Sequence, residues 1–336
     1  MKKIIRTILA SVMVAVMLTG TFGCSSCGGN GVLMKYYSSA ADVLPLLKTG
    51  NAHVALLPEP AATKLSKIAV DKEWFRLDLQ ELYDGEAKSY PQAVLMMKTS
   101  VINEFPQIID DMSDKFSQGM EWVKNDTSLA VQAVNEKMVE GVTPSLDASL
   151  NEQVVENCNI YWQSANNGKE AAKNYINDII SVESTAATKL NDDFFFTQSK
   201  EVESSGKEEF FFVVPDGAPA LAVAKFMNDN EDFTTGLPFN YSVVAANNIG
   251  SFMQQGKADI MIMPINAASK LYKANASDPY QMVAIITHGN LYIVSDEEIT
   301  LEDLSEREVA VIGQGLVPDL TFKAVLKKHG MNFKVA

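Results

Sequence analysis

Residue types that carry out enzyme chemistry are sparse in this chain and are not grouped at catalytic spacings. Its three histidines are His53, His288 and His329, and no cluster of histidine, cysteine and acidic residues has metal-ligand spacing. Cys24 and Cys27 have C-x-x-C spacing, but they lie in a stretch rich in serine and glycine. The sequence has no serine elbow and no Walker loop. We therefore expect no catalysis, no metal and no cofactor.

Two glycine-containing turns have residue types suited to holding a small ligand. They are DGAPAL, beginning at Asp216, and GQGLVPDL, beginning at Gly313. Glycine lets backbone N–H groups approach a ligand closely at a helix N-terminus, where the helix dipole favours negative charge. Neither turn contains the G-x-G-x-x-G pattern of dinucleotide sites. Such glycines can equally be plain turn residues, and both interpretations stay open.

Composition limits the partners and the size of the fold. The chain has 336 residues, 47% hydrophobic, which is enough for two domains of ordinary size. Its net charge of −14 argues against a nucleic-acid partner, because phosphate binding needs a basic surface.

The N-terminus is typical of an export signal. Basic Lys2, Lys3 and Arg6 precede an apolar run at 8–18 that is too short to span a bilayer. The stretch TGTFGC, ending at Cys24, resembles a bacterial lipoprotein cleavage box. We expect residues 1–31 to be a signal peptide and tether, with Cys24 lipidated at the outer face of the cell membrane. Plain secretion is the alternative.

The segments that carry the turns alternate between strand and helix patterns, which predicts an α/β fold. Residues 49–65 and 255–271 align without a gap and share a glycine, a proline and a lysine at the same register. The strand, glycine turn and proline-bearing helix at 210–227 also recur at 308–328. We interpret the chain as a duplicated lobe in which one copy has been cut by circular permutation, a change tolerated where chain ends lie close together.

The middle of the chain has a different pattern. After a strand near 93, residues 106–182 contain amphipathic helical patterns, and we expect the segment SLNEQVVENCNIYW at 149–162 to be helical. Residues 198–208 are polar and lack periodicity, so we expect a linker.

Several stretches together resemble a known family. They include VVPDGAPALAVAKFM, GKADIMIMPINAASKLY, VAVIGQGLVPDLTFKAVLKKHGM, YYSSAADVLPLLKTG and ALLPEPAATKL. These are similar to substrate-binding proteins of ABC transporters, of the nitrate/sulfonate/taurine and thiamine-precursor type. The resemblance covers nearly all of 32–336, but 209–336 would normally precede 32–197. It implies a two-lobed periplasmic-binding-protein-like fold, each lobe a mainly parallel sheet flanked by helices, with a hinge of crossover strands near 90–97 and 289–295.

On this resemblance, lobe one is 93–290 and lobe two combines 32–92 with 291–336. Ligands of open α/β sheets bind at the carboxyl ends of the strands, which face the other lobe in this fold. The expected ligand-binding residues at these strand ends are Asp216, Gly217, Ala218, Pro264, Asn266, Thr287, His288, Gly289, Asn290, Gly313, Gln314, Gly315, Tyr37, Ser38, Ser39, Pro58 and Glu59.

The scarcity of arginine bears on the solute. Only Arg6, Arg76 and Arg307 are present, so no bidentate clamp for a sulfonate or carboxylate is evident at the strand ends. This favours a neutral, heteroaromatic or amine-containing solute. The resemblance implies a monomer that closes about its hinge and delivers the solute to an ABC permease. An enzyme of the same fold, of the thiamine-pyrimidine or menaquinone-pathway type, and a surface sensor or adhesin remain alternatives.

Overall fold

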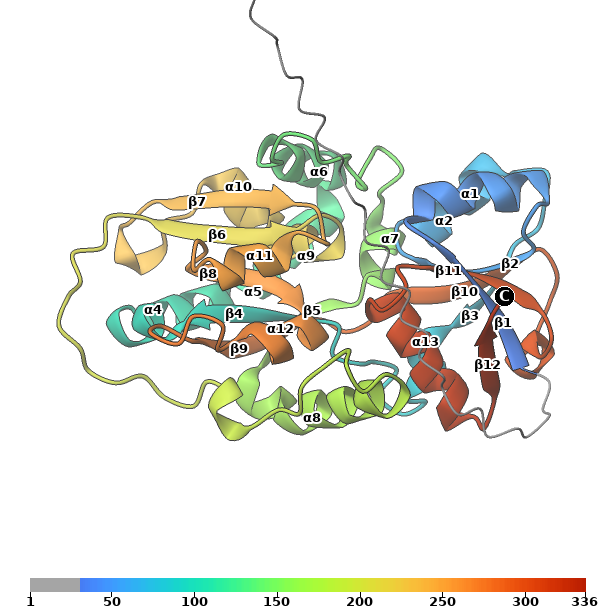
Figure 1. Ribbon diagram of the computed structural model, residues 1–336. Coiled ribbons are helices and arrows are strands. Elements are labelled where there is room, and N and C mark those ends of the chain that lie inside the picture. The colour runs from blue at the N-terminus through green and yellow to red at the C-terminus, as the bar shows by residue number, and fades with distance from the viewer. Residues whose placement is uncertain (1–30) are drawn as a thin grey trace, which may run out of the picture.

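The computed structural model describes residues 31–336, and these form two lobes side by side, each with its own six-stranded sheet (Figure 1). Helices flank both sheets. The predicted two-lobed α/β fold class is therefore confirmed. The expected signal peptide and the expected lipidation site at Cys24 lie outside the described residues.

The sheet of lobe two draws strands from both ends of the described chain. Its spatial order is β12 (Asn332–Val335), β1 (Gly31–Tyr37), β11 (Glu308–Ile312), β2 (Val54–Pro58), β10 (Leu291–Ser295) and β3 (Phe75–Asp78). The first four strands run parallel, and β10 is antiparallel to both of its neighbours. The helical elements of this lobe are α1 (Ala40–Thr49), α2 (Ala61–Ile68), α3 (Leu79–Tyr83), η3 (Glu302–Leu304) and α13 (Val317–Lys328).

The sheet of lobe one is mixed. Its spatial order is β5 (Ile160–Ser164), β9 (Tyr280–Thr287), β4 (Ala93–Lys98), β8 (Ile260–Pro264), β6 (Phe210–Pro215) and β7 (Phe239–Val244). Strand β6 is parallel to both neighbours, whereas β4, β5 and β9 form antiparallel pairs. Its helical elements are α4 (Thr99–Glu104), α5 (Gln107–Asn125), α6 (Thr127–Glu136), α7 (Glu152–Asn157), α8 (Ala165–Val182), η1 (Asp192–Phe194), α9 (Ala218–Leu221), α10 (Ala224–Asp229), η2 (Phe233–Thr235), α11 (Ile249–Gln254) and α12 (Ile265–Leu271).

One secondary-structure expectation was wrong. Residues 149–162 were expected to be one helix, but α7 ends at Asn157 and Ile160 begins β5. The segment pairs with β9 as the edge strand of the sheet, and this long-range pairing overrides the local helical pattern. Its isoleucine, tyrosine and tryptophan suit a half-buried strand.

Five strands of each sheet correspond in order and direction. The series β1-β11-β2-β10-β3 matches β7-β6-β8-β4-β9, with two parallel pairings followed by two antiparallel ones in each case. The repeated sequence segments fall on β2 with α2 and on β8 with α12, which occupy the same place in the two series.

The chain crosses between the sheets twice, and the two crossings bind each other. One runs from β3 through α3 to β4, and the other is the short link between β9 and β10. The backbone N–H groups of Tyr90 and Gln92 donate to the carbonyls of His288 and Thr287 at 3.2 and 2.9 Å. Gly289 has a φ of 95°, and a β-carbon there would lie 2.7 Å from the Tyr90 ring. Only glycine fits this crossing without strain.

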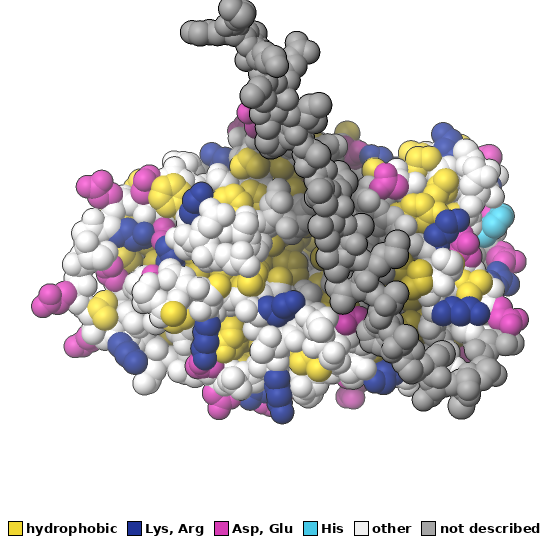
Figure 2. Space-filling view, in the orientation of Figure 1, with side chains coloured by type: hydrophobic (Ala, Val, Ile, Leu, Met, Phe, Trp, Pro, Cys, Tyr) yellow, Lys and Arg dark blue, Asp and Glu magenta, His cyan; other side chains and the backbone are white. Residues whose placement is uncertain are grey.

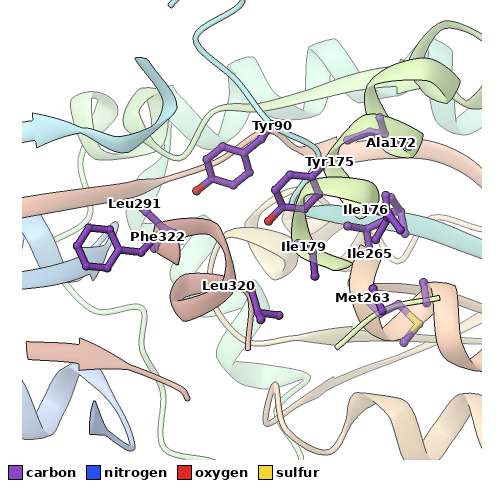
Figure 3. Close-up of a cluster of buried hydrophobic side chains, with 14 of the residues drawn as sticks. Tyr90, Ala172, Tyr175, Ile176, Ile179, Met263, Ile265, Leu291, Leu320 and Phe322 are labelled. Atoms are coloured by element: carbon purple, nitrogen blue, oxygen red, sulfur yellow. The ribbon is translucent and has the colours of Figure 1, made fainter. Parts of the chain in front are cut away.

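An apolar cluster joins the lobes on one side of these crossings (Figure 3). Tyr90 stacks on Tyr175 of α8 with ring centroids 5.4 Å apart. The Tyr175 hydroxyl lies 2.6 Å from the Thr321 hydroxyl of α13, and Leu320 and Phe322 of α13 are fully buried in the same cluster. Because α8 belongs to lobe one and α13 to lobe two, this side of the molecule is held by packing.

The segment expected as a linker is fastened to lobe one by a buried carboxylate. Asp259, 3% exposed, accepts hydrogen bonds from the Lys98 ammonium at 3.1 Å and from the Phe211 N–H at 3.0 Å. The ammonium of Lys207, within the 198–208 segment, lies 2.9 Å from the other oxygen of Asp259.

Replacing Asp259 by alanine leaves two lysines without their buried partner. We expect the Asp259→Ala variant to lose about 3–5 kcal/mol in free energy of unfolding, as is usual when one partner of a buried ion pair is removed. Urea denaturation followed by circular dichroism measures the loss. Glu308→Ala, which removes a carboxylate from the exposed Lys35–Glu308 pair, is the matched control. An equal effect of both substitutions would contradict the assignment.

Candidate functional site

A pocket of about 450 Å³ lies at the carboxyl ends of β1 and β11 in lobe two. Its lining residues are Tyr36, Tyr37, Ser38, Asp42, Gly313 and Gln314. Four of the residues expected from sequence therefore meet here, although they come from opposite ends of the described chain. Two more expected residues, Ser39 and Gly315, directly follow the lining residues Ser38 and Gln314 in the sequence.

The pocket lies on the edge of the sheet that faces lobe one. Strands β1, β11 and β2 run parallel, so their carboxyl ends share this edge. Directly after β2, the Glu59 carboxylate accepts a hydrogen bond from the Asn157 amide of lobe one at 3.1 Å. Helix α2 carries Lys64, whose ammonium lies 2.6 Å from the Asp147 carboxylate of lobe one.

The buried carboxylate of Asp319 lies next to the pocket and contacts one of its lining residues, Tyr36. Asp319 is fully buried and accepts a hydrogen bond from the Tyr36 hydroxyl at 2.9 Å and from the Gly315 N–H at 2.8 Å. The Lys323 ammonium lies 2.9 Å from the same carboxylate. Burial, followed by the negative charge of Asp319, raises the pKa of Tyr36, so its hydroxyl keeps its proton and remains a donor.

In both glycine turns a backbone N–H donates to a carboxylate of the protein itself. The Gly315 N–H donates to Asp319, and the Gly217 N–H donates to the Asp216 carboxylate at 2.8 Å. The second oxygen of Asp216 accepts the N–H of Ser145 at 2.7 Å. These two N–H groups are therefore already partnered within the protein.

Asp216, Gly217 and Ala218 lie at the end of β6, against the 145–149 loop of lobe one that also contacts α2. They do not line the pocket at β1 and β11. Their binding role stays a prediction.

Glu59, which follows Pro58 at the end of β2, is buried and fully partnered. Its carboxylate accepts the N–H and hydroxyl of Thr63 at 3.0 and 2.7 Å, and Arg76 donates to it at 3.1 Å. With the bond from Asn157, this carboxylate ties α2 and β3 to lobe one. All of these hydrogen-bond partners of Glu59 are residues of the protein, and a ligand role for Glu59 stays a prediction.

The remaining expected residues lie at the crossings and are mostly buried: Pro264, Asn266, Thr287, His288, Gly289 and Asn290. Asn290 donates to the Glu59 carbonyl at 3.2 Å, and Asn266 donates to the Ala186 carbonyl at 3.3 Å. The Asn290 bond links the crossing to lobe two, whereas the Asn266 bond lies within lobe one. Contact of these residues with a ligand also stays a prediction.

His288 has an unusual environment for a histidine. It is 2% exposed, its ring lies flat on that of Tyr161 with centroids 3.4 Å apart, and neither ring nitrogen has a hydrogen-bond partner among the described residues. Burial lowers the pKa of His288 to about 3, because a buried imidazolium loses its hydration. The ring is therefore neutral at physiological pH.

Sequence reasoning missed two acidic residues at the pocket, Asp42 and Asp319, and one at the contact between the lobes, Asp147. Asp319 follows Pro318 in the first turn of a helical pattern, where an acidic residue usually faces solvent and complements the helix dipole. Its burial against Tyr36 depends on a contact between residues 283 positions apart. No local signal in the sequence indicates that contact.

Residues 31–336 contain no group of three or more histidine, cysteine or acidic side chains able to hold a metal ion. None of the helices in this range has the length and apolar character needed to cross a membrane. Acidic and basic side chains are interspersed over the face in Figure 2.

Comparison with protein-family models and with curated proteins found no match. Among solved structures, the chain is similar to the oligopeptide-binding protein AppA from Bacillus subtilis, with 12% identity, a TM-score of 0.27, and coverage of 80% of this chain and 56% of that one. It is also similar to NikZ from Campylobacter jejuni, with 10% identity, a TM-score of 0.30, and coverage of 85% and 59%. The chain thus spans less than two thirds of these structures. Similarity at this level identifies neither a ligand nor a mechanism here.

The environment of His288 predicts a pH dependence of stability. Its pKa falls from the ordinary 6.5 to about 3 on folding. The contribution of the neutral ring to the free energy of unfolding is therefore complete above pH 6.5 and is lost as the pH falls towards 3. Between pH 6 and 4 we expect the wild type to lose about 1.4 kcal/mol per pH unit more than His288→Phe.

Urea titrations at several pH values measure these two slopes. His329→Phe, which removes an exposed histidine, controls for the substitution itself. Equal slopes for the wild type and His288→Phe would show that His288 takes up a proton in the folded state as readily as in the unfolded state.

Proposed function

We propose that this protein captures a small solute outside the cytoplasm and passes it to an ABC permease. The observation that carries the proposal is the position of the pocket. It lies at the carboxyl ends of parallel strands, on the edge of lobe two that faces lobe one. A ligand held there by one lobe is within reach of the other, and this is the arrangement that hinge closure requires.

The contacts between the lobes differ on the two sides of the molecule, which supports a hinge on the side of α8 and α13. The packed cluster of α8 and α13 holds one side, while the contacts beside α2 are polar: the buried Glu59 carboxylate accepts from Asn157, and the others are partly exposed. There Lys64 pairs with Asp147, and Lys67 donates to the Ser149 carbonyl at 2.7 Å. The hydrogen bond from Lys64 lowers the pKa of Asp147 to about 2, so this carboxylate is charged at physiological pH. Polar contacts of this kind break and re-form at small cost.

The corresponding strand orders of the two sheets support a circularly permuted gene. In lobe one, the chain runs from β6 through α9 and α10 into β7, and then through α11 into β8. The strands of lobe two that correspond to β6, β7 and β8 are β11, β1 and β2. Along the chain, however, β1 and β2 come first and β11 comes near the end. We place the cut between β12 and β1, which lie side by side in the sheet.

Two further parts of the proposal rest on sequence. Lipidation at Cys24 would hold the protein at the outer face of the membrane, where a permease is within reach. The nitrate/sulfonate/taurine and thiamine-precursor resemblance places its solute among small molecules, and we propose that it acts as a monomer.

If the lobes close about a hinge, Lys64 and Lys67 of α2 should favour the closed state, because both contact lobe one. In Lys64→Ala/Lys67→Ala we expect the closed population to fall about threefold, because exposed ionic contacts contribute about 0.2–1 kcal/mol each. Single-molecule fluorescence energy transfer between labels on α1 and α6 measures the population.

Lys48→Ala, which removes an exposed lysine from α1 in the same lobe, is the control. A single population with the same transfer efficiency in all three proteins would mean that the lobes do not move, and the proposed mechanism would fail.

A further inference from the structure

The pocket at β1 and β11 has a distinctive charge pattern. Its lining contains one carboxylate, Asp42, and no lysine or arginine. One oxygen of Asp42 accepts the N–H and the hydroxyl of Ser39 at 3.0 and 2.9 Å, which fixes the side chain. Within residues 31–336 no basic side chain forms an ion pair with Asp42. Its charge therefore acts on whatever enters the pocket.

The positive end of α13 also adjoins this pocket, since α13 starts at Val317, shortly after Gly313 and Gln314. A helix of this length attracts an anion to its free N–H groups. Here the Asp319 carboxylate accepts the Gly315 N–H at 2.8 Å and is itself fully buried. The Gly315 N–H is therefore not free to bind an external anion, while the charge of Asp319 itself is paired with the Lys323 ammonium at 2.9 Å.

Comparison with lobe one shows that the strand–turn–helix unit does not itself require this buried carboxylate. Pro219 and Pro318 stand in the first turn of the corresponding helices, and the residue after them is Ala220 in lobe one but Asp319 in lobe two. Ala220 is also fully buried. Burying a charge is costly, and the Lys323 ammonium, 2.9 Å away, offsets that cost. What distinguishes lobe two is that the carboxylate accepts from Gly315 and Tyr36 beside the pocket.

We infer that Asp319 is a specificity-determining residue that makes the pocket reject anions, and that Asp42 selects a solute with an amine or other cationic group. The inference rests on the proposed function and narrows its solute class. Asp319 acts through the Gly315 N–H and the Tyr36 hydroxyl, both of which it holds as acceptor. A solute would meet Tyr36, Tyr37 and the Gln314 amide as uncharged neighbours.

Three probes with one aromatic body and different head groups test the inference: benzylamine, benzyl alcohol and benzenesulfonate. Isothermal titration calorimetry of the full chain gives their dissociation constants. We expect the wild type to bind benzylamine most tightly and benzenesulfonate most weakly. In Asp319→Asn, which removes the charge and keeps the size, we expect the ratio of the two constants to shift by about tenfold or more towards the sulfonate.

Asp42→Asn provides a second test that leaves the core untouched, because Asp42 is exposed. It should weaken benzylamine several-fold and leave benzyl alcohol unchanged. Asp71→Asn removes an exposed carboxylate that does not line the pocket and serves as control. If Asp319→Asn does not fold, the Asp42→Asn result decides the solute class.

The outcomes separate this inference from the function beneath it. If the wild type binds none of the probes, the inference is wrong, and the proposed function is then decided separately by the energy-transfer measurement of lobe closure. If the wild type binds benzylamine but neither substitution changes the ratio, the function stands and the inference is wrong. Tighter binding of benzenesulfonate by the wild type would also overturn the inference.

Discussion

The parallel pairing of β1 with β11 is the interaction on which the rest of the structure depends. It pairs residues from Leu33 opposite Glu308 to Tyr37 opposite Ile312, over five register positions. The Leu33 N–H donates to the Arg307 carbonyl and the Gly313 N–H donates to the Tyr37 carbonyl, both at 2.9 Å. Because the pocket is made at the carboxyl ends of these two strands, without the pairing Tyr36 would not reach Asp319 and the pocket would not exist.

The two sides of the molecule are held together by different physical means. On one side, Tyr90, Tyr175 and the buried residues of α13 form a dry cluster that resists separation (Figure 3). On the other, Lys64 and Asp147 meet as partly exposed charges. Apolar packing gains its stability from buried area and is lost when the surfaces part, whereas exposed ion pairs contribute little. This difference favours movement on the α2 side and a fixed axis at the crossings.

The sequence predicts the helices and strands better than it predicts the contacts between them. The alternation of strand and helix patterns and the repeated segment at 49–65 and 255–271 both agree with the structure. Strand β5 was missed because its conformation depends on β9. The burial of Asp319 and His288 was missed for the same reason, since each is enclosed by residues far away in the chain. The glycine turns were expected to hold a ligand, but the sequence did not indicate that the Gly217 and Gly315 N–H groups donate to carboxylates of the protein.

Native-state hydrogen exchange tests the account most directly, because it follows individual amides and needs no ligand. The pairing of β1 with β11 predicts that the amides of Leu33 and Gly313 are protected to a degree similar to those in the centre of the lobe-one sheet, such as Val213. Exchange of the β1 amides at the rate of an unstructured chain, with β11 still protected, would show that the two ends of the chain do not form one sheet.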